Sequence, residues 1–331
     1  MDNKINYVTL NDIKTASENL AKSENYLRTP LIKNIQNYSK IMESKNFSSL
    51  NFKMENMQKE GSYKIRGIMN FITNIDKNNK FVTFSGGNFA RSFAYVSKQL
   101  RLDSTIVMPE DVPVSRVEIC KKYGSNVVLS KRSELLNTVN DFVKKGYKAI
   151  HPFDSPVIVS GCGTIGLEIL EDLPEVDLVI VGIGGGALVS GIAAAMKLSG
   201  SKAKIIGVEP EGAAKMFNSL KEGKAHTLKA INTFASGLSP PFTVPMVYEH
   251  TKKFVDEVVL VSDDSIKKAM NIFYHDYKLV VESSGSACLA AILENKIDVK
   301  GKKVVCLLSG GNVSVDELQK VFIDVSKMPK F

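Results

Sequence analysis

A lysine in the first quarter of the chain is followed by three glycine-rich loops that could surround its amine. Lys64 lies in the stretch 61–67, and the loops are Ser85-Gly86-Gly87-Asn88, Gly184-Gly185-Gly186-Ala187 and Ser309-Gly310-Gly311-Asn312. Most lysines are only solvated surface charges. An activated lysine amine, however, can form a Schiff base with a carbonyl group, and glycine-turn amides can bind anions. The combination predicts a cage for a cofactor, in which the loops hold a phosphate, a ring and a carboxylate.

Each loop follows a short apolar run that predicts a buried β-strand. Strand-like runs alternate with helix-like runs, which is typical of parallel sheets with right-handed crossovers. The strand-like runs are 81–83, 104–108, 126–129, 178–181, 204–208 and 303–308, and the helix-like runs include 89–99, 113–122, 133–145 and 189–198. Any one loop could be a plain strand-to-helix turn. Strand-end loops of one sheet converge in space, however, so three of them with one lysine favour a shared site.

The second loop has two interpretations when it is taken alone. Its backbone amides and the positive end of the following helix could bind an anion. The spacing Gly182-x-Gly184-x-x-Ala187 also fits a dinucleotide-binding turn, with Glu209 placed to bind a ribose. The mid-chain position of this window favours the first interpretation. A nicotinamide or flavin enzyme would also leave the Lys64 and Asn88 segments unexplained.

The composition of the chain is typical of a soluble globular protein. A chain of 331 residues has room for two domains, and 44% hydrophobic with 24% charged residues is ordinary for a soluble globular protein. The net charge of +8 is scattered, which argues against nucleic-acid binding. Residues 178–196 carry no charge, but their five glycines favour a buried strand, turn and helix over a membrane span.

The four cysteines are not at a metal-binding spacing, and Met1-Asp2-Asn3-Lys4 does not begin a secretory pattern. Together these observations predict a reducing, cytoplasmic setting. Arg66, two residues after the lysine, is expected to be an ion-pair partner rather than a catalyst.

The chain resembles the fold-type II pyridoxal-phosphate enzymes of the serine/threonine dehydratase and serine racemase family. The matching segments run in order over nearly the whole chain: Arg28-Thr29-Pro30-Leu31, Lys53-Met54-Glu55-Asn56 through Gly67, Val107-Met108-Pro109-Glu110, His151-Pro152-Phe153-Asp154, Gly163-Thr164, Val208-Glu209-Pro210 and Glu282-Ser283-Ser284-Gly285. The resemblance implies an α/β fold with two parallel-sheet, three-layer domains, similar to the tryptophan synthase β chain. Residues 1–79 and 155–331 would form the large domain, and residues 80–154 the small domain with the Asn88 loop.

The resemblance also implies pyridoxal 5'-phosphate as cofactor and a role for each site residue. Lys64 would hold the cofactor as an imine and later act as the base on the substrate α-carbon. The residues expected at the cofactor are Lys64, Tyr63, Asn88, Gly184, Gly185, Gly186, Ala187, Leu188, Gly237, Glu282 and Ser309. Those expected at the substrate are Ser85, Gly86, Gly87, Asn88, Phe89 and Cys162.

The implied activity is β-elimination from a hydroxy amino acid, L-threonine or L-serine, to a 2-keto acid and ammonia, by a homodimer. A racemase or β-replacement synthase of the same family is the first alternative. An NAD-dependent oxidoreductase and a non-catalytic amino-acid-binding protein are the distant ones. Gly86 stands where racemases of the family carry a serine as second base, so racemisation is expected to be slow. Phe89 and Cys162 replace the family's histidine and glutamine, which leaves the accepted side chain open.

The divalent-cation site of relatives is altered in this chain. The corresponding positions are Glu209, the carbonyl of Ala213 and Lys215. A lysine cannot ligate magnesium and would repel it, so no metal is expected. Either the Lys215 ammonium replaces the ion by pairing with Glu209, or Lys215 points to solvent.

Overall fold

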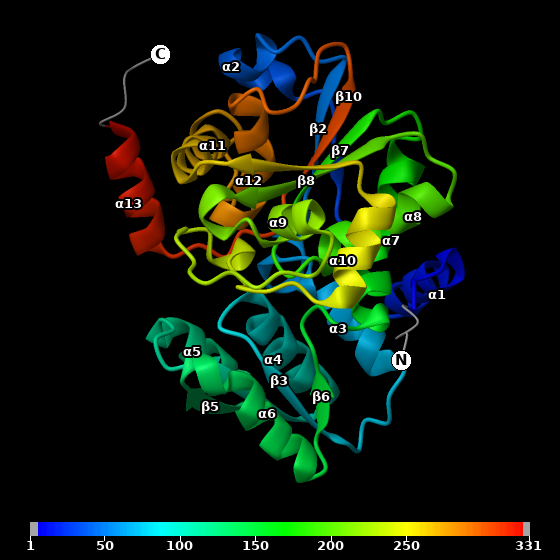
Figure 1. Cartoon of the computed structure of the whole chain (residues 1–331), viewed down its shortest axis with the longest axis vertical. Helices are drawn as coiled ribbons and strands as arrows, with labels where there is room; N and C mark the ends of the chain where they lie inside the picture. Colours follow the sequence, from blue (N-terminus) through cyan, green and yellow to red (C-terminus); the bar gives the residue numbers. More distant parts are fainter. Residues whose placement is uncertain (1–5, 327–331) are drawn as a thin grey trace.

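The computed structural model describes residues 6–326, and its strands form two separate sheets with helices around them (Figure 1). One sheet has the order β1-β2-β10-β7-β8-β9 and the other β5-β4-β3-β6. All neighbouring strands are parallel except β1 and β2. The strands are β1 (Leu31–Ile32), β2 (Ser49–Lys53), β3 (Lys80–Phe84), β4 (Asp103–Pro109), β5 (Asn126–Ser130), β6 (Lys148–Ile150), β7 (Leu178–Gly182), β8 (Lys204–Pro210), β9 (Glu257–Val261) and β10 (Lys303–Leu307).

Helices pack around both sheets and follow the strands in alternation. They are α1 (Leu10–Ala21), α2 (Lys40–Glu43), α3 (Lys64–Thr73), α4 (Asn88–Leu100), α5 (Val114–Lys122), α6 (Leu135–Lys144), α7 (Pro156–Asp172), α8 (Ala187–Leu198), α9 (Lys215–Glu222), α10 (Pro245–Phe254), α11 (Asp263–His275), α12 (Ser283–Leu293) and α13 (Val315–Ser326), with short 3-10 turns such as η3 (Lys59–Gly61) and η6 (Ser236–Leu238). The predicted α/β fold with parallel sheets is confirmed.

The central strand β7 is apolar throughout because both of its faces are buried. Val179 and Val181 face a core shared with α7 and α8, whereas Leu178 and Ile180 face a second core with α11 and α12. Successive strand residues point to opposite faces, so a strand covered on both sides has no position for a charge. The uncharged segment 178–196 is therefore β7, a glycine turn and α8, and no helix of residues 6–326 is long and apolar enough to cross a membrane.

The predicted strands and helices agree with these elements, but strands β1, β2, β6 and β9 were not predicted. Strand β2 illustrates the reason. Its sequence contains Asn51 and Lys53, yet all five residues are buried. The Asn51 amide donates to the Val304 carbonyl at 2.9 Å, and Lys53 belongs to a buried ion-pair network. Contacts with distant residues thus satisfy the polar side chains of this buried strand. A search for apolar runs along the sequence does not detect such a strand.

The four-stranded sheet uses only residues 80–150, inside the predicted small domain of 80–154. Figure 1 shows this sheet with α5 and α6 on one side of the molecule and the six-stranded sheet on the other. The division into two domains stays a prediction, and its ends at residues 1–5 and 327–331 lie outside the described residues.

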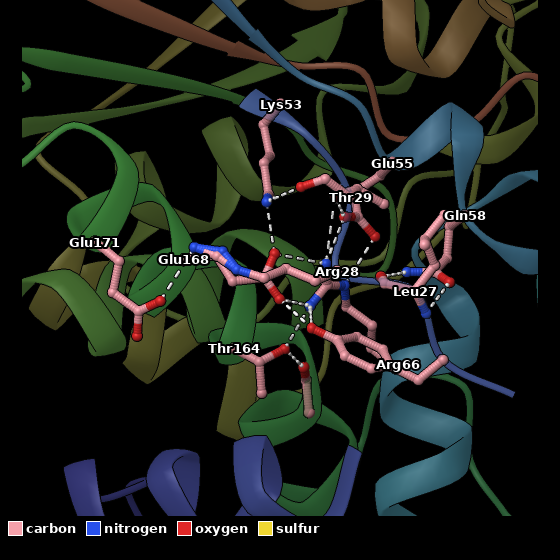
Figure 2. Close-up of polar contacts among 12 residues, drawn as sticks. Leu27, Arg28, Thr29, Lys53, Glu55, Gln58, Arg66, Thr164, Glu168 and Glu171 are labelled. Carbon is pink, nitrogen blue, oxygen red and sulfur yellow. Dashed lines mark hydrogen bonds and ion pairs between the residues drawn. The ribbon is translucent and has the colours of Figure 1, made fainter. Parts of the chain in front are cut away.

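A buried network of four charges holds the helix that begins at Lys64 (Figure 2). The Arg66 guanidinium binds Glu55 through Nε and Nη2 at 2.8 and 2.7 Å. It binds Glu168 of α7 through Nη1 and Nη2 at 2.6 and 2.9 Å. The Lys53 ammonium lies 2.5 Å from Glu168 and donates to the Thr29 carbonyl. The expectation that Arg66 is an ion-pair partner is confirmed. The two cations and two carboxylates fix α3 against β2 and α7.

Glu168 makes the stability of the folded protein depend on pH. Burial alone would raise the pKa of this carboxyl, but Arg66 and then Lys53 outweigh it and hold the pKa at about 2, below the ordinary 4.5. A depressed pKa stabilises the folded protein above the unfolded value, and this stabilisation is lost as the pH falls towards the folded value.

We therefore expect Glu168→Gln to remove part of the acid sensitivity of folding. The Glu168 contribution to the unfolding free energy of the unaltered protein should fall by about 3 kcal/mol from about pH 5 to pH 2, because the carboxyl gains a proton on unfolding. Denaturant titrations at each pH measure this slope. Glu171→Gln is the matched control, because Glu171 lies on the same helix and pairs only at the exposed surface with Arg28. Equal slopes for Glu168→Gln and the unaltered protein would contradict the account.

Candidate active site

Lys64 is the first residue of α3 and lies against the loop that follows β10. The Tyr63 amide donates to the Ser309 carbonyl at 3.2 Å, and the Lys64 amine lies 4.7 Å from the centre of the Tyr63 ring. Burial lowers the pKa of Lys64, with nearby Cys162 and Glu282 opposing the shift. A lysine in this setting is neutral at lower pH than a solvated one, as a nucleophile or base requires.

A polar triad joins three loops beside the lysine. The Asn88 amide donates to Glu282 Oε1 at 2.7 Å, and the Asn312 backbone amide donates to Glu282 Oε2 at 3.1 Å. The Asn312 side chain donates to Asn88 Oδ1 at 3.0 Å. Burial raises the pKa of Glu282, which the two donated hydrogen bonds oppose. Asn88 and Glu282 were both predicted to lie at the site. Asn312 was given no role, although it occupies the same place in its loop as Asn88.

The glycine loop after β7 forms a close-packed turn with free donors. Within residues 6–326 the backbone amides of Gly184, Gly185 and Gly186 have no hydrogen-bond acceptor. A Cβ on Gly184 would lie 2.4 Å from the Gly237 carbonyl oxygen, and one on Gly185 would lie 2.2 Å from the Phe153 ring. Gly186 has φ 95°, which favours glycine. Amides at the start of the long helix α8 suit a phosphate.

Gly237 links the glycine loop to the triad. Its Cβ position would lie 2.2 Å from Ser284 Oγ and 3.6 Å from Glu282 Oε1. Ala187 and Leu188, the first residues of α8, are buried beside this turn. Residues 184–188, Gly237 and Glu282 therefore form a continuous surface. Phe153, which packs on Gly185, was missed because an aromatic side chain in a loop carries no positional signal.

The loop predicted for the substrate carboxylate ends β3 and starts α4. Ser85 Oγ accepts a hydrogen bond from the Gly87 amide at 3.2 Å, and the Gly86 carbonyl accepts one from Arg116 at 3.2 Å. The N-cap of α4 is Gly87, with no side-chain cap, so neither Ser85 nor Asn88 caps the helix.

Cys162 and Phe89 belong to the hydrophobic core that adjoins the site. Both are at most 3% exposed. Burial raises the pKa of the Cys162 thiol to about 12, and Lys64 is the largest opposing influence.

Lys215 forms a buried ion pair with Glu209 close to the start of the glycine loop. Its ammonium lies 3.0 Å from Glu209 Oε1 and donates to the Leu238 and Ile183 carbonyls at 3.2 and 3.5 Å. Both charged side chains are buried, so the predicted ion pair is confirmed and the solvent-facing alternative is wrong. Residues 6–326 contain no cluster of three or more His, Cys, Asp or Glu suited to a metal.

The same pair bears on the dinucleotide interpretation of the loop. The Glu209 carboxylate also accepts hydrogen bonds from the Met216 and Phe217 amides at 3.0 and 2.9 Å. Both of its oxygens are used inside the protein, so neither is available to a ribose. The spacing Gly182-x-Gly184-x-x-Ala187 therefore lacks the free acidic partner of a dinucleotide site.

We expect Lys215→Met to lower the unfolding free energy by about 3–5 kcal/mol, because Glu209 is left as an unpaired buried charge. Lys197→Met is the control, since Lys197 pairs with Asp256 at a partly exposed position and should cost about 1 kcal/mol or less. Denaturant unfolding measures both. Addition of a chelator should leave the unaltered protein's stability unchanged. A Lys215→Met effect as small as the control's, or a loss of stability in chelator, would contradict this assignment.

Comparison with known proteins places these features in a family. The family described as pyridoxal-phosphate dependent enzymes matches residues 22–310. The L-threonine ammonia-lyase of Thermotoga maritima is 36% identical over 322 residues, covering 95% of this chain and 78% of that protein. The catabolic L-threonine dehydratase of Escherichia coli is 33% identical over 323 residues, covering 95% and 98%.

Solved structures agree with the sequence comparison. Maize serine racemase superimposes with a TM-score of 0.88 at 32% identity, covering 97% of this chain and 99% of that one. The match to the family spans the strands of both sheets, the Lys64 segment and the first two glycine loops, and it ends at Gly310 in the third loop. The chain belongs to the pyridoxal-phosphate dependent enzymes, as a member of fold type II.

Proposed function

We propose that this protein is a threonine/serine ammonia-lyase, which converts a hydroxy amino acid into a 2-keto acid and ammonia. The observation that carries the proposal is the setting of Lys64. Lys64 is partly buried, burial lowers the pKa of its amine, and its helix begins against the loop that follows β10. Relatives that cover 95% of the chain are named L-threonine ammonia-lyase and L-threonine dehydratase.

The residues at the site suit pyridoxal phosphate. We assign its phosphate to the unpaired amides of Gly184, Gly185 and Gly186, with Ala187, Leu188 and Gly237 around them. Lys64 would be the covalent attachment point, with Tyr63 beside the ring. Asn88 and Glu282 would face one edge of the ring and Ser309 its nitrogen. A hydroxyl at that nitrogen, unlike a carboxylate, does not force it to carry a proton, which suits elimination.

The protein's own groups would then perform the proton transfers. The bound cofactor supplies the electron sink that makes the substrate α-proton acidic. Lys64 Nζ would take this proton and return it to the β-hydroxyl, which leaves as water while the Cα–H electron pair forms the Cα–Cβ double bond. The unsaturated amine adds water and releases ammonia, which leaves the 2-keto acid. The Ser85–Gly87 loop would orient the substrate through its carboxylate.

A racemase is the alternative from the same family, since serine racemase has a similar structure. Racemisation needs a second proton-bearing group on the opposite face of the α-carbon. Gly86, the position in question, has no side chain, and a Cβ there would lie 3.3 Å from Pro109 and Val112. These facts favour elimination.

We further propose a two-domain enzyme that acts as a cytoplasmic homodimer, with the active site between residues 80–154 and the rest of the chain. The four cysteines are buried free thiols, which supports a reducing compartment. The homodimer rests on the resemblance alone.

We expect Lys64→Ala to lower the release of 2-keto acid from L-threonine or L-serine by at least about 10²- to 10⁴-fold, because the general base is lost. The assay uses a panel of L- and D-hydroxy amino acids and a keto-acid reagent. Lys59→Ala, at an exposed position five residues earlier, serves as control and should retain activity. Keto-acid release that survives in Lys64→Ala would contradict the role of the lysine. Absence of release from every amino acid would favour the racemase, synthase or binding-protein alternatives.

A further inference from the structure

Glu60 has a backbone conformation that is unusual for a residue with a side chain. It lies in η3, four residues before Lys64, with φ 61° and ψ 20°. Residues other than glycine, asparagine and aspartate rarely adopt this left-handed region. Such a conformation persists only where surrounding contacts fix it, and it concentrates at functional sites. The neighbouring Gly61 also has positive φ, so two successive residues of this turn have left-handed backbone.

The Glu60 carboxylate binds two helices that flank the four-stranded sheet. Arg91 of α4 donates from Nε to one oxygen at 2.8 Å, and the Tyr123 hydroxyl at the end of α5 donates to the other at 2.7 Å. The carboxylate is 11% exposed. A side chain from the Lys64 loop thus uses both oxygens to hold a unit built from residues 80–150.

The Glu60 backbone joins the same turn to the polar triad. Its carbonyl accepts a hydrogen bond from the Asn312 side chain at 2.7 Å, and Asn312 also contacts Asn88. The Gly61 carbonyl accepts one from the Gly311 amide at 2.9 Å. The turn is therefore tied on one side to the loop after β10 and on the other to α4 and α5.

Arg91 connects the Glu60 carboxylate to the Ser85–Gly87 loop. It lies in the first turn of α4, and its backbone amide donates to the Gly87 carbonyl at 3.2 Å. The Ser85–Gly87 loop leads directly into that turn. A displacement of Arg91 relative to Glu60 would therefore change the separation between the loop and Lys64.

We propose that Glu60 is a positioning residue that fixes the Lys64 turn to the first turn of α4, and so sets the distance between Lys64 and the loop that holds the substrate carboxylate. This rests on the proposed function for the identity of the substrate and for the roles of Lys64 and the Ser85–Gly87 loop. The contact acts through Arg91 and Tyr123 and touches neither substrate nor cofactor. Catalysis loses rate steeply when reacting groups are misplaced by about 1 Å, so loss of the contact affects turnover more than folding.

The test compares Glu60→Gly, Tyr123→Phe and Glu60→Gln in the cofactor-loaded enzyme. Glu60→Gly removes the contact and relieves the backbone, so kcat/KM should fall by about tenfold or more while the unfolding midpoint is kept or rises. Tyr123→Phe removes one hydrogen bond and should lower kcat/KM by about five- to tenfold. Glu60→Gln keeps an acceptor for Tyr123 and should lie between the unaltered enzyme and Glu60→Gly. Tyr147→Phe, in the same four-stranded unit but outside this contact, is the control and should match the unaltered enzyme.

Hydrogen exchange followed by mass spectrometry gives a readout that does not need activity. Exchange in residues 59–67 and 85–95 should become faster in Glu60→Gly, whereas exchange in β10 stays unchanged. Unchanged kcat/KM together with unchanged exchange would overturn the proposal. Faster exchange throughout the protein, with a lower unfolding midpoint, would also overturn it, because the role would then be structural. If the unaltered enzyme releases no keto acid, the proposed function fails, and the exchange data alone still decide the role of Glu60.

Discussion

The bidentate contacts of Arg66 with two buried carboxylates are the constraint on which the position of Lys64 depends. A buried guanidinium is costly unless both charge and hydrogen-bonding capacity are matched. Here Glu55 and Glu168 supply that match, and Lys53 and Thr164 complete it. Because Arg66 lies two residues after Lys64, the network fixes the first turn of α3 against β2 and α7. The lysine can then be held in place without a carboxylate of its own.

The buried cationic side chains differ in whether they have a carboxylate partner. Arg66, Lys53 and Lys215 each pair with a buried carboxylate. Lys64 forms no ion pair within the described residues, and burial lowers its pKa. A paired ammonium stays charged and inert, whereas an unpaired one near apolar surface gives up its proton more readily. Lys215 also places a positively charged side chain next to the turn that leads into Gly184, through its contact with the Ile183 carbonyl.

Much of this architecture could be predicted from the sequence. The apolar strands, the glycine loops at their ends and Lys64 follow local rules that leave a pattern along the chain. The Glu209–Lys215 pair could be predicted only through the family resemblance, which placed a lysine at a cation position and left a solvent-facing lysine as the alternative. Asn312, Glu60 and Arg91 could not be predicted, since their roles arise from contacts between distant segments. Glu60 in particular reads as an ordinary exposed loop residue until its backbone angle and two donors are seen. Strand β2 was missed because its polar residues are satisfied only in the tertiary structure.

The central claim is that Lys64 is the residue that holds the cofactor, and its site of attachment is the most direct test. The protein would be loaded with pyridoxal phosphate, reduced with borohydride, digested and mapped by mass spectrometry. The account predicts that the added pyridoxyl mass lies on the peptide that contains Lys64 and on no other. A label on Lys215 or on another lysine, or no label in protein that has bound the cofactor, would contradict it.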